Sequence, residues 1–169
     1  MKTVKTVFAI DPGLDAGWAA FVDGELETAG VFKTSRKDRW EVRAQHVADE
    51  LIERACAFGP RSLGYLHMYV EYPQLFGGSG GQMVAARGDL GKLYFTVGCI
   101  AHRFYLADTE FELVSPNRWK GQLSKEVVCA RLTRKLTKAE RAVLSPLKRG
   151  VGSHDWDAAG IGLWALGRF

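Results

Sequence analysis

The stretch V-K-T-V-F-A-I-D-P-G-L-D-A-G-W-A-A-F-V, residues 4–22, contains two apolar runs separated by Asp11-Pro12-Gly13. The first run, residues 7–10, is typical of a strand that is buried on both faces of a sheet. The Pro-Gly turn ends that strand, and residues 17–22 should run back beside it. An Asp before Pro-Gly is by itself well explained as a turn cap. At the end of a central strand, however, a buried carboxylate needs a cation, a metal or a catalytic role.

The chain has 169 residues, so we expect a single domain over residues 1–169 with its own core. Hydrophobic residues make up 47% and charged residues 25%, a balance typical of globular proteins and not of disordered ones. The net charge of +4 is only weak support for a polyanionic partner. The apolar start is too short for a signal peptide, and no run is long enough to span a membrane. A cytoplasmic protein is therefore expected.

The three cysteines, Cys56, Cys99 and Cys129, are far apart in the sequence and lie in apolar surroundings. Their spacing is not that of a metal site, and their odd number argues against a disulfide framework. We therefore expect three small core residues in a reducing compartment.

The first half of the chain predicts a meander followed by a helix. Asp23-Gly24 is a hairpin turn signal, so residues 25–32 are expected to form a third, antiparallel strand. Asp38–Glu41 has the pattern of a capping box, and apolar residues then recur at helical spacing up to Ala55. Gly59-Pro60 should end this helix.

Tyr65–Val70 repeats the pattern of the first strand, because an apolar run leads directly into Glu71 and a proline follows at position 73. Since a helix connects the meander to this strand, the strand should run parallel to the first one. Asp11 and Glu71 would then lie side by side at the carboxyl edge of the sheet. Open α/β sheets build their sites at that edge.

The middle of the chain is rich in glycine. Leu75–Gly81 lacks the Gly-Lys-Ser/Thr of a phosphate-binding loop, so a surface loop is the simplest interpretation. A long helix is expected over residues 82–105, although Gly88, Gly91 and Gly98 weaken it. Such glycines are tolerated where another backbone comes close. They indicate either close packing on the sheet or a subunit interface.

A fifth strand is expected over residues 111–114, and a basic segment with a central aromatic residue follows it at Asn117–Gly121. This composition suits contact with a phosphate backbone, with Trp119 beside it. Trp119 is equally well explained as a lid on the hydrophobic core.

Two helices and a basic loop come next. Ser124 is expected to cap a helix that runs to about Leu136, and residues 137–140 show a second capping-box pattern for a short helix. The loop of residues 145–153 carries Lys148 and Arg149 beside glycines.

The last helix should be strongly apolar and should begin at Ser153, a favourable N-cap residue. Its first turn holds His154, Asp155 and Asp157. Acidic residues in a first turn are favoured by the helix dipole, which is a sufficient explanation by itself. His154 and Asp157 are three residues apart and share one face of the helix, whereas Asp155 points elsewhere.

Asp11, Glu71, His154 and Asp157 each lie at the end of an expected core element. Hard divalent ions such as Mg²⁺ bind carboxylate oxygens together with water and substrate phosphate. Mn²⁺ also tolerates a neutral imidazole. Two such ions can activate a water and stabilise the leaving oxygen of a phosphodiester. Without a cation, carboxylates this close would repel one another and one of them would hold a proton.

The order of the elements resembles that of a ribonuclease H-like fold, and the motifs resemble those of RuvC-type Holliday junction resolvases. The matching residues are the Asp11-Pro12-Gly13 turn, Glu71 at its strand end, the helix with Ala86-Arg87-Gly88, and His154–Ala158 at the start of the last helix. The resemblance covers nearly the whole chain. It implies an α/β fold with a five-stranded mixed sheet, made of an antiparallel meander and two parallel strands, flanked by helices.

By this resemblance the chain is a metal-dependent endonuclease that resolves four-way DNA junctions by paired symmetric nicks. A homodimer is implied, since two matched nicks need two active sites. Asp11, Glu71 and Asp157 would bind two Mg²⁺ ions per site, for which Mn²⁺ can substitute. His154 falls where the family has Asp or His.

DNA-binding residues follow from the same resemblance and from the basic segments. Phe76 lies where these resolvases place an aromatic residue that wedges into the junction, and Lys120 and Lys125 resemble the basic residues near the scissile phosphate. The segment between these lysines is shorter than in bacterial enzymes, which favours a compact prokaryotic or phage-encoded relative. The further DNA contacts that we expect come from four residues: Arg87, Arg118, Lys148 and Arg149.

Several alternatives stay open. The same fold and chemistry would serve a nuclease for flaps, forks or other branched DNA. A module that binds branched DNA without cutting it is less favoured, because all four site positions carry a suitable side chain. An actin-like fold also opens with an Asp-x-Gly hairpin but needs a second half that 169 residues cannot hold. In the simplest alternative, the carboxylates are caps and turn residues only.

Overall fold

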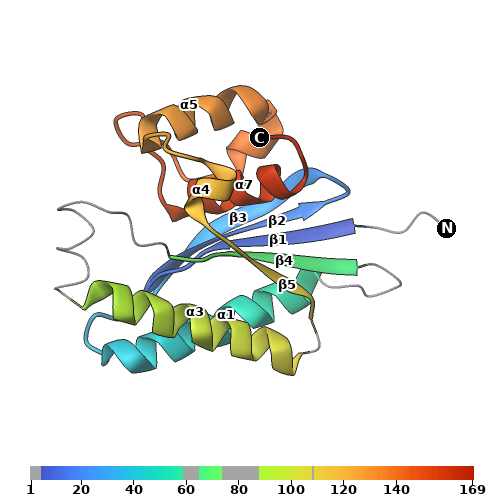
Figure 1. Cartoon of the computed structure of the whole chain (residues 1–169). Helices are drawn as coiled ribbons and strands as arrows, with labels where there is room; N and C mark the ends of the chain where they lie inside the picture. The colour runs from blue at the N-terminus through green and yellow to red at the C-terminus, as the bar shows by residue number, and fades with distance from the viewer. Residues whose placement is uncertain (1–4, 59–64, 74–87, 108) are drawn as a thin grey trace.

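The structure is a computed structural model that describes residues 5–58, 65–73, 88–107 and 109–169 (Figure 1). A sheet lies between two layers of helices. The elements are β1 (Lys5–Asp11), β2 (Asp15–Val22), β3 (Glu25–Lys33), α1 (Trp40–Phe58), β4 (Tyr65–Glu71), α3 (Asp89–Leu106), β5 (Phe111–Val114), α4 (Pro116–Trp119), α5 (Lys125–Lys135), α6 (Lys138–Ala142) and α7 (His154–Ala165).

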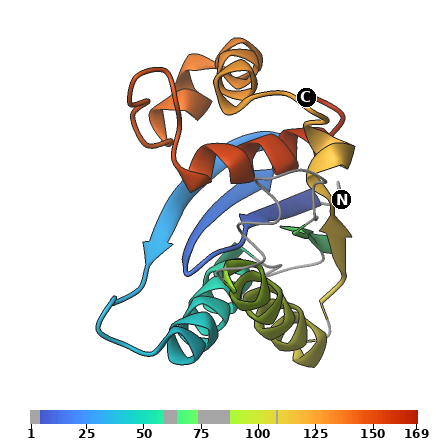
Figure 2. The same cartoon turned by 60° about the vertical axis from the view of Figure 1, so that its left-hand side comes forward.

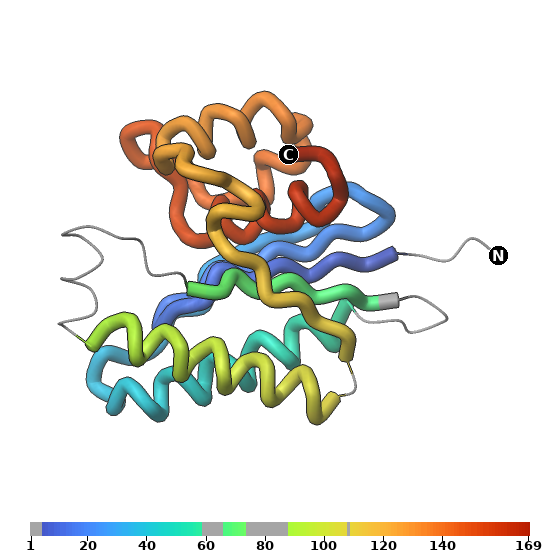
Figure 3. Tube along the Cα trace, in the orientation of Figure 1, coloured from blue at the N-terminus to red at the C-terminus, as the bar shows by residue number. Residues whose placement is uncertain are grey.

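The sheet has five strands in the order β3-β2-β1-β4-β5. β1, β2 and β3 form an antiparallel meander, whereas β4 runs parallel to β1 and β5 runs parallel to β4. The predicted mixed sheet is therefore confirmed. Figure 3 shows the chain passing along β5 from the layer of α3 to the opposite layer, where α4 and α7 lie.

Two hydrophobic cores fill the two faces of the sheet. α1 and α3 cover one face and α7 covers the other, with α4 and α5 on the same side as α7 (Figures 1 and 2). The segment Val7–Ile10 of β1 is at most 1% exposed, because alternate side chains enter the two cores. The sequence pattern predicted such a doubly buried strand. Within the described residues, no helix is both long enough and apolar enough to cross a bilayer.

Several local expectations are confirmed. The Ser124 side chain accepts a hydrogen bond from the backbone N–H of Val127, and Thr137 and Glu140 form a reciprocal capping box. Glycines in α7 permit close packing, because a Cβ added at Gly160 would lie 2.5 Å from the Trp119 ring.

Other local expectations are wrong. α1 begins at Trp40, so the residue before it is Arg39, and Asp38 does not hold the capping position. α3 begins at Asp89 because Gly88 adopts a left-handed conformation with φ of 69°, which interrupts a helix. Residues 82–87 of the expected helix lie outside the described residues. Cys56 is exposed and is not a core residue, whereas Cys129 is buried.

The glycines of α3 do not pack on the sheet. A Cβ added at Gly91 or Gly98 would meet no atom within 4 Å, so these positions face open space. Close packing against the described part of the chain is therefore excluded as their explanation, and the alternative of a subunit interface remains.

Candidate active site

Three elements bring the acidic residues together at one edge of the sheet. Ile10 of β1 pairs with Val70 of β4, so the residues that follow them, Asp11 and Glu71, end neighbouring parallel strands. On the other side of β1, Asp11 pairs with Gly17 of β2. The first turn of α7 approaches the sheet at this point and supplies the remaining side chains.

Gly17 permits the close approach of α7. A Cβ at this position would lie 2.1 Å from the backbone oxygen of His154 and 2.7 Å from its Cβ. Because real Cβ atoms do not come this close to other atoms, any larger residue would displace the start of α7. A glycine inside a strand often marks such an approach of another backbone. Gly17 within an apolar strand pattern is thus the sequence signal for the position of α7, and it was missed above.

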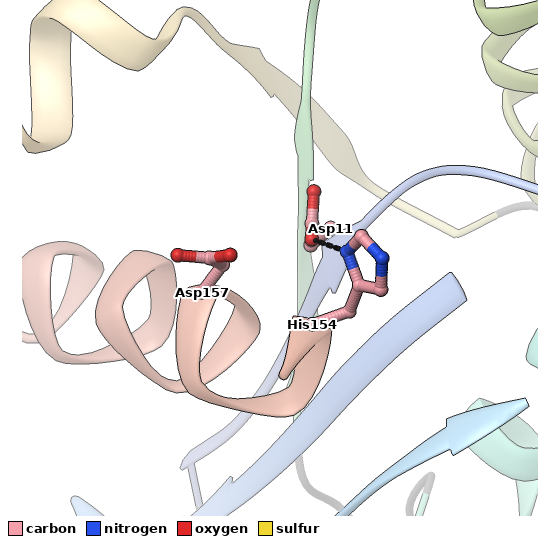
Figure 4. A group of neighbouring side chains, drawn as sticks. All are labelled: Asp11, His154 and Asp157. Atoms are coloured by element: carbon pink, nitrogen blue, oxygen red, sulfur yellow. Dashed lines mark hydrogen bonds and ion pairs between the residues drawn. The ribbon is translucent and has the colours of Figure 1, made fainter. Parts of the chain in front are cut away.

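Asp11, His154 and Asp157 form a compact group, shown in Figure 4. One potential ligand atom from each residue lies within 4.8 Å of those of the other two. Nδ1 of His154 is 2.6 Å from Oδ2 of Asp11. Asp11 and Asp157 are 9% and 8% exposed, whereas the His154 side chain is 48% exposed. The group therefore combines two buried carboxylates with an imidazole at the surface.

Glu71 lies next to this group but is held separately. Its Oε2 accepts a hydrogen bond of 2.7 Å from Nε1 of Trp119 and lies 3.4 Å from Nζ of Lys120. Glu71 was expected beside the other three residues, and it lies next to them but outside their 4.8 Å group. Trp119 is 3% exposed, so it belongs to the core and does not offer a stacking surface.

Two lysines bring positive charge to the carboxylates. Nζ of Lys125 lies 2.7 Å from Oδ2 of Asp157. Nζ of Lys120 contacts Glu71 and lies 4.6 Å from the ring centre of Trp119. Both lysines were expected near a scissile phosphate, and both lie beside the acidic residues.

The electrostatics of the site indicate an excess of negative charge. Burial, followed by the charge of Asp11, raises the pKa of Glu71 to about 7. Burial and the charge of Asp11 also raise the pKa of Asp157. The hydrogen bond to Asp11 raises the pKa of His154. A divalent cation would relieve this repulsion, and carboxylate oxygens with one imidazole are suitable donors for Mg²⁺ or Mn²⁺. The residues present therefore fit a metal site.

Asp155 has a different environment, as expected from its position on the helix. It is fully buried and accepts hydrogen bonds from the backbone N–H of Ser145, at 2.6 Å, and from the Ser153 hydroxyl. These bonds connect the loop before α7 to the start of the helix. Asp155 is thus a structural residue that supports the first turn of α7.

The remaining residues that we expected to bind DNA are dispersed. Arg118 forms an ion pair of 2.6 Å with Glu112 and lies over the Trp164 ring. Lys148 and Arg149 are exposed on a tight turn, where Arg149 has a φ of 52°. None of these three lies in the acidic group. The other two residues, Phe76 and Arg87, lie outside the described residues.

Comparisons with known proteins support the fold. No family model and no curated protein sequence matches the chain. Among solved structures, RuvC from Thermus thermophilus in complex with a Holliday junction substrate is similar, with a TM-score of 0.65 and 21% identity over 94% of this chain and 90% of that one. A second Thermus thermophilus RuvC structure has a TM-score of 0.62 and 18% identity over 96% of this chain and 97% of that one. The expected fold is confirmed: the chain has a RuvC-type, ribonuclease H-like fold.

Proposed function

We propose that this protein is a divalent-metal-dependent endonuclease that resolves four-way DNA junctions by paired symmetric nicks. The observation that carries the proposal is the gathering of Asp11, His154 and Asp157 beside Glu71 at the carboxyl edge of the two central strands. A similar solved structure contains a RuvC bound to a Holliday junction substrate. The prokaryotic or phage origin and the cytoplasmic location stay predictions.

In this proposal the four residues Asp11, Glu71, His154 and Asp157 hold two Mg²⁺ ions, for which Mn²⁺ can substitute. Bound there, the ions would supply an activated water and would stabilise the leaving oxygen of the phosphodiester. Asp11 and Asp157 are buried carboxylates, and burial together with the charge of Asp11 raises the pKa of Glu71 to about 7. A cation bound here would relieve this repulsion and favour the ionised form of Glu71.

The side chains around the cluster orient it and bind the substrate. Trp119 fixes the direction of the Glu71 carboxylate through its Nε1–H. Nδ1 of His154 is hydrogen-bonded to Asp11. The other ring nitrogen, Nε2, therefore stays available at the exposed side of the imidazole (Figure 4). Lys120 and Lys125 hold two carboxylates and can also bind phosphate oxygens, since an ammonium group has three donors. The cluster thus lies between basic side chains that attract a DNA backbone.

Substrate competition tests the proposal against its alternatives. The protein would be given labelled four-way junction, replication fork and linear duplex at equal concentrations with Mg²⁺ or Mn²⁺. A resolvase is expected to nick the junction in preference to the other two. Equal cutting of junction and fork would favour a general branched-DNA nuclease. Tight junction binding without cutting under any metal would favour a binding module.

A homodimer is part of the proposal, because paired nicks need two active sites. α3 exposes Gly91, Phe95 and Gly98, which share one face of the helix at spacings of four and three residues. Phe95 is 40% exposed, as is Val42 on the neighbouring α1. A two-fold interface uses the same patch twice, and glycines let two such helices approach closely. We therefore propose this face of α3 as the subunit interface.

Gly91→Arg is expected to dissociate this dimer, because two arginines related by the two-fold axis would collide and repel. The dimer dissociation constant should rise by about 100-fold or more. Light scattering over a range of concentrations measures this, and junction binding should weaken in parallel. Ala139→Arg adds the same side chain to an exposed position of α6 and serves as the control. An unchanged dimer in Gly91→Arg would show that the interface lies elsewhere.

Gly17→Ala is expected to slow cleavage by about 100-fold, because the added Cβ displaces His154 from the cluster. Overpacking should also reduce the free energy of unfolding by roughly 1–3 kcal/mol. Gly162→Ala is a matched control, since its Cβ would lie 2.1 Å from the Phe21 ring, two turns beyond His154. Single-turnover cleavage and thermal unfolding would be measured for both variants. Equal losses of cleavage would mean that reduced stability, and not the position of His154, is responsible.

A further inference from the structure

A cleft of about 700 Å³ opens beside the acidic cluster. It lies between the turn after β1, the link between β3 and α1, and the first turns of α3. His154 lines the cleft and also belongs to the cluster, so the two are continuous. Of the predicted site residues that the structure describes, His154 alone lines this cleft.

Basic side chains line the cleft from separate elements: Arg36 from the link, Arg43 from α1 and Lys92 from α3. Asp15 and Asp89 also line it, so its charge depends on how these groups are paired. Nη2 of Arg43 lies 3.5 Å from Oδ1 of Asp15, and Nζ of Lys92 lies 3.2 Å from Oδ1 of Asp89. Arg36 is exposed and takes part in no ion pair among the described residues. Among its described arginine, lysine and aspartate side chains, the cleft therefore has three positive and two negative charges.

Arg43 is fixed in position. Its side chain is only 14% exposed, and its Nε donates a hydrogen bond of 2.6 Å to Oγ1 of Thr34. The backbone N–H of Thr34 in turn donates to Asp15. These contacts hold the link that carries Arg36 against the turn that follows Asp11. Arg43 is thus a positioning residue. Arg36 is the group directly available to a ligand, and Lys92, 37% exposed, can offer the donors that its ion pair with Asp89 does not use.

We infer that this cleft binds the phosphate backbone of the DNA strand immediately next to the phosphodiester at the acidic cluster, an inference that rests on the proposed function. Lys120 and Lys125 bring positive charge to the carboxylates themselves, whereas Arg36 and Lys92 lie in the cleft beyond His154. A strand that enters the cleft would place successive phosphates near Arg36, near Lys92 and at the cluster. Guanidinium and ammonium groups are the usual partners of phosphate oxygens.

Neutralising these cations tests the inference through binding alone. In an Asp11→Asn background without divalent metal, junction affinity would be measured by fluorescence anisotropy at several salt concentrations. Arg36→Ala should weaken binding by about 5- to 10-fold and reduce the slope of log affinity against log salt by about 1. Lys135→Ala, at an exposed site near the end of α5, is the matched control and should change neither. An Arg36→Ala variant with unchanged affinity and slope would overturn the inference.

A second variant predicts a gain, which partial misfolding cannot produce. Asp89→Asn frees Lys92 from its ion pair and removes a negative charge from the cleft. Junction binding should therefore tighten by about 2- to 5-fold. Unchanged or weaker binding in this variant would contradict the inferred role of Lys92.

The position of the contact can be mapped on the DNA. Methylphosphonates, which carry no charge, would replace single phosphates on either side of the nicked one. A methylphosphonate at one phosphate next to the nicked one should weaken DNA binding by the wild-type protein. The same substitution should not weaken binding by Arg36→Ala, which already lacks the cation that contacts this phosphate. Equal losses in both proteins at every position would place Arg36 away from the strand.

These experiments separate the inference from the proposed function. If junctions are bound and nicked but Arg36→Ala binds them as tightly as its parent protein, only this inference fails. If no DNA is bound at all, the proposed function fails with it.

Discussion

Replacing Asp11 by asparagine is expected to slow junction cleavage by about 10³-fold or more while junction binding persists. Asp11 is the central residue of the cluster, because it interacts with each of the other three site residues. It ends β1 beside Glu71, contacts His154 at 2.6 Å, and its charge raises the pKa values of Glu71 and Asp157. Asparagine has the same shape and can still accept a hydrogen bond from the imidazole. The variant thus removes the negative charge and keeps the packing.

The same variant should be more stable than the wild type when no divalent metal is present. Burial and Asp11 raise the pKa of Glu71 to about 7 from 4.5, so the folded state favours the protonated carboxyl. Protonated Glu71 therefore contributes to the free energy of unfolding. This contribution is fully present below about pH 4.5 and is lost as the pH rises through about 7, where the buried carboxyl ionises. Without the charge of Asp11, this loss should be smaller.

Thermal unfolding with and without Mg²⁺ measures the effect. The ion should raise the melting temperature of the wild type through binding to the folded state, and it should do little for Asp11→Asn. Glu27→Gln removes a charge from an exposed position of β3 and should behave like the wild type. An Asp11→Asn variant that cleaves junctions at a rate close to that of the wild type would rule out the proposed metal site.

Glu140→Gln is expected to destabilise the fold by about 3 kcal/mol at neutral pH, because it breaks a buried ion pair. Glu140 is 4% exposed, and its two oxygens lie 2.8 and 3.1 Å from the guanidinium of Arg168. They also accept hydrogen bonds from the backbone N–H groups of Leu26 and Thr137. Glu140 thereby joins β3, α6 and the segment that follows α7.

The pH dependence of stability separates this ion pair from simple loss of packing. Burial opposes ionisation of Glu140, but Arg168 and the backbone donors outweigh it and lower the pKa from 4.5 to about 2. The ionised carboxylate therefore stabilises the fold fully above about pH 4.5, and this stabilisation is lost as the pH falls to about 2. The shift corresponds to about 3 kcal/mol.

Urea unfolding at a series of pH values should show this loss in the wild type and not in Glu140→Gln. Glu53→Gln, at an exposed position of α1, is the control and should follow the wild type. Parallel curves for Glu140→Gln and the wild type would mean that Glu140 is not ionised in the folded protein.

The sequence predicts those parts of the fold that depend on local patterns. The apolar run before Asp11 and its repeat before Glu71 define two buried strands, and a helical connection makes them parallel. The position of both carboxylates at one edge then follows from topology. The spacing of His154 and Asp157 on α7 predicts that they share a face, and the structure brings both to Asp11.

The contacts that no local pattern predicts join residues that are distant along the chain. Trp119 and Glu71 are 48 positions apart, and no local pattern indicates their hydrogen bond. The cleft with Arg36 and Lys92 forms only when the link after β3 meets the start of α3. The helix boundary at Asp89 was missed because a glycine within a helical pattern is compatible with both a weakened helix and a left-handed start.

The most direct test of the proposed function is cleavage of a four-way junction labelled in turn at the 5′ end of each strand, with Mg²⁺ and with Asp11→Asn in parallel. We expect nicks at matching positions on two opposite strands in the wild type, and binding without nicks in the variant. A junction that stays intact while bound by the wild type, with Mg²⁺ and with Mn²⁺, would contradict the proposal that this cluster is a nuclease centre.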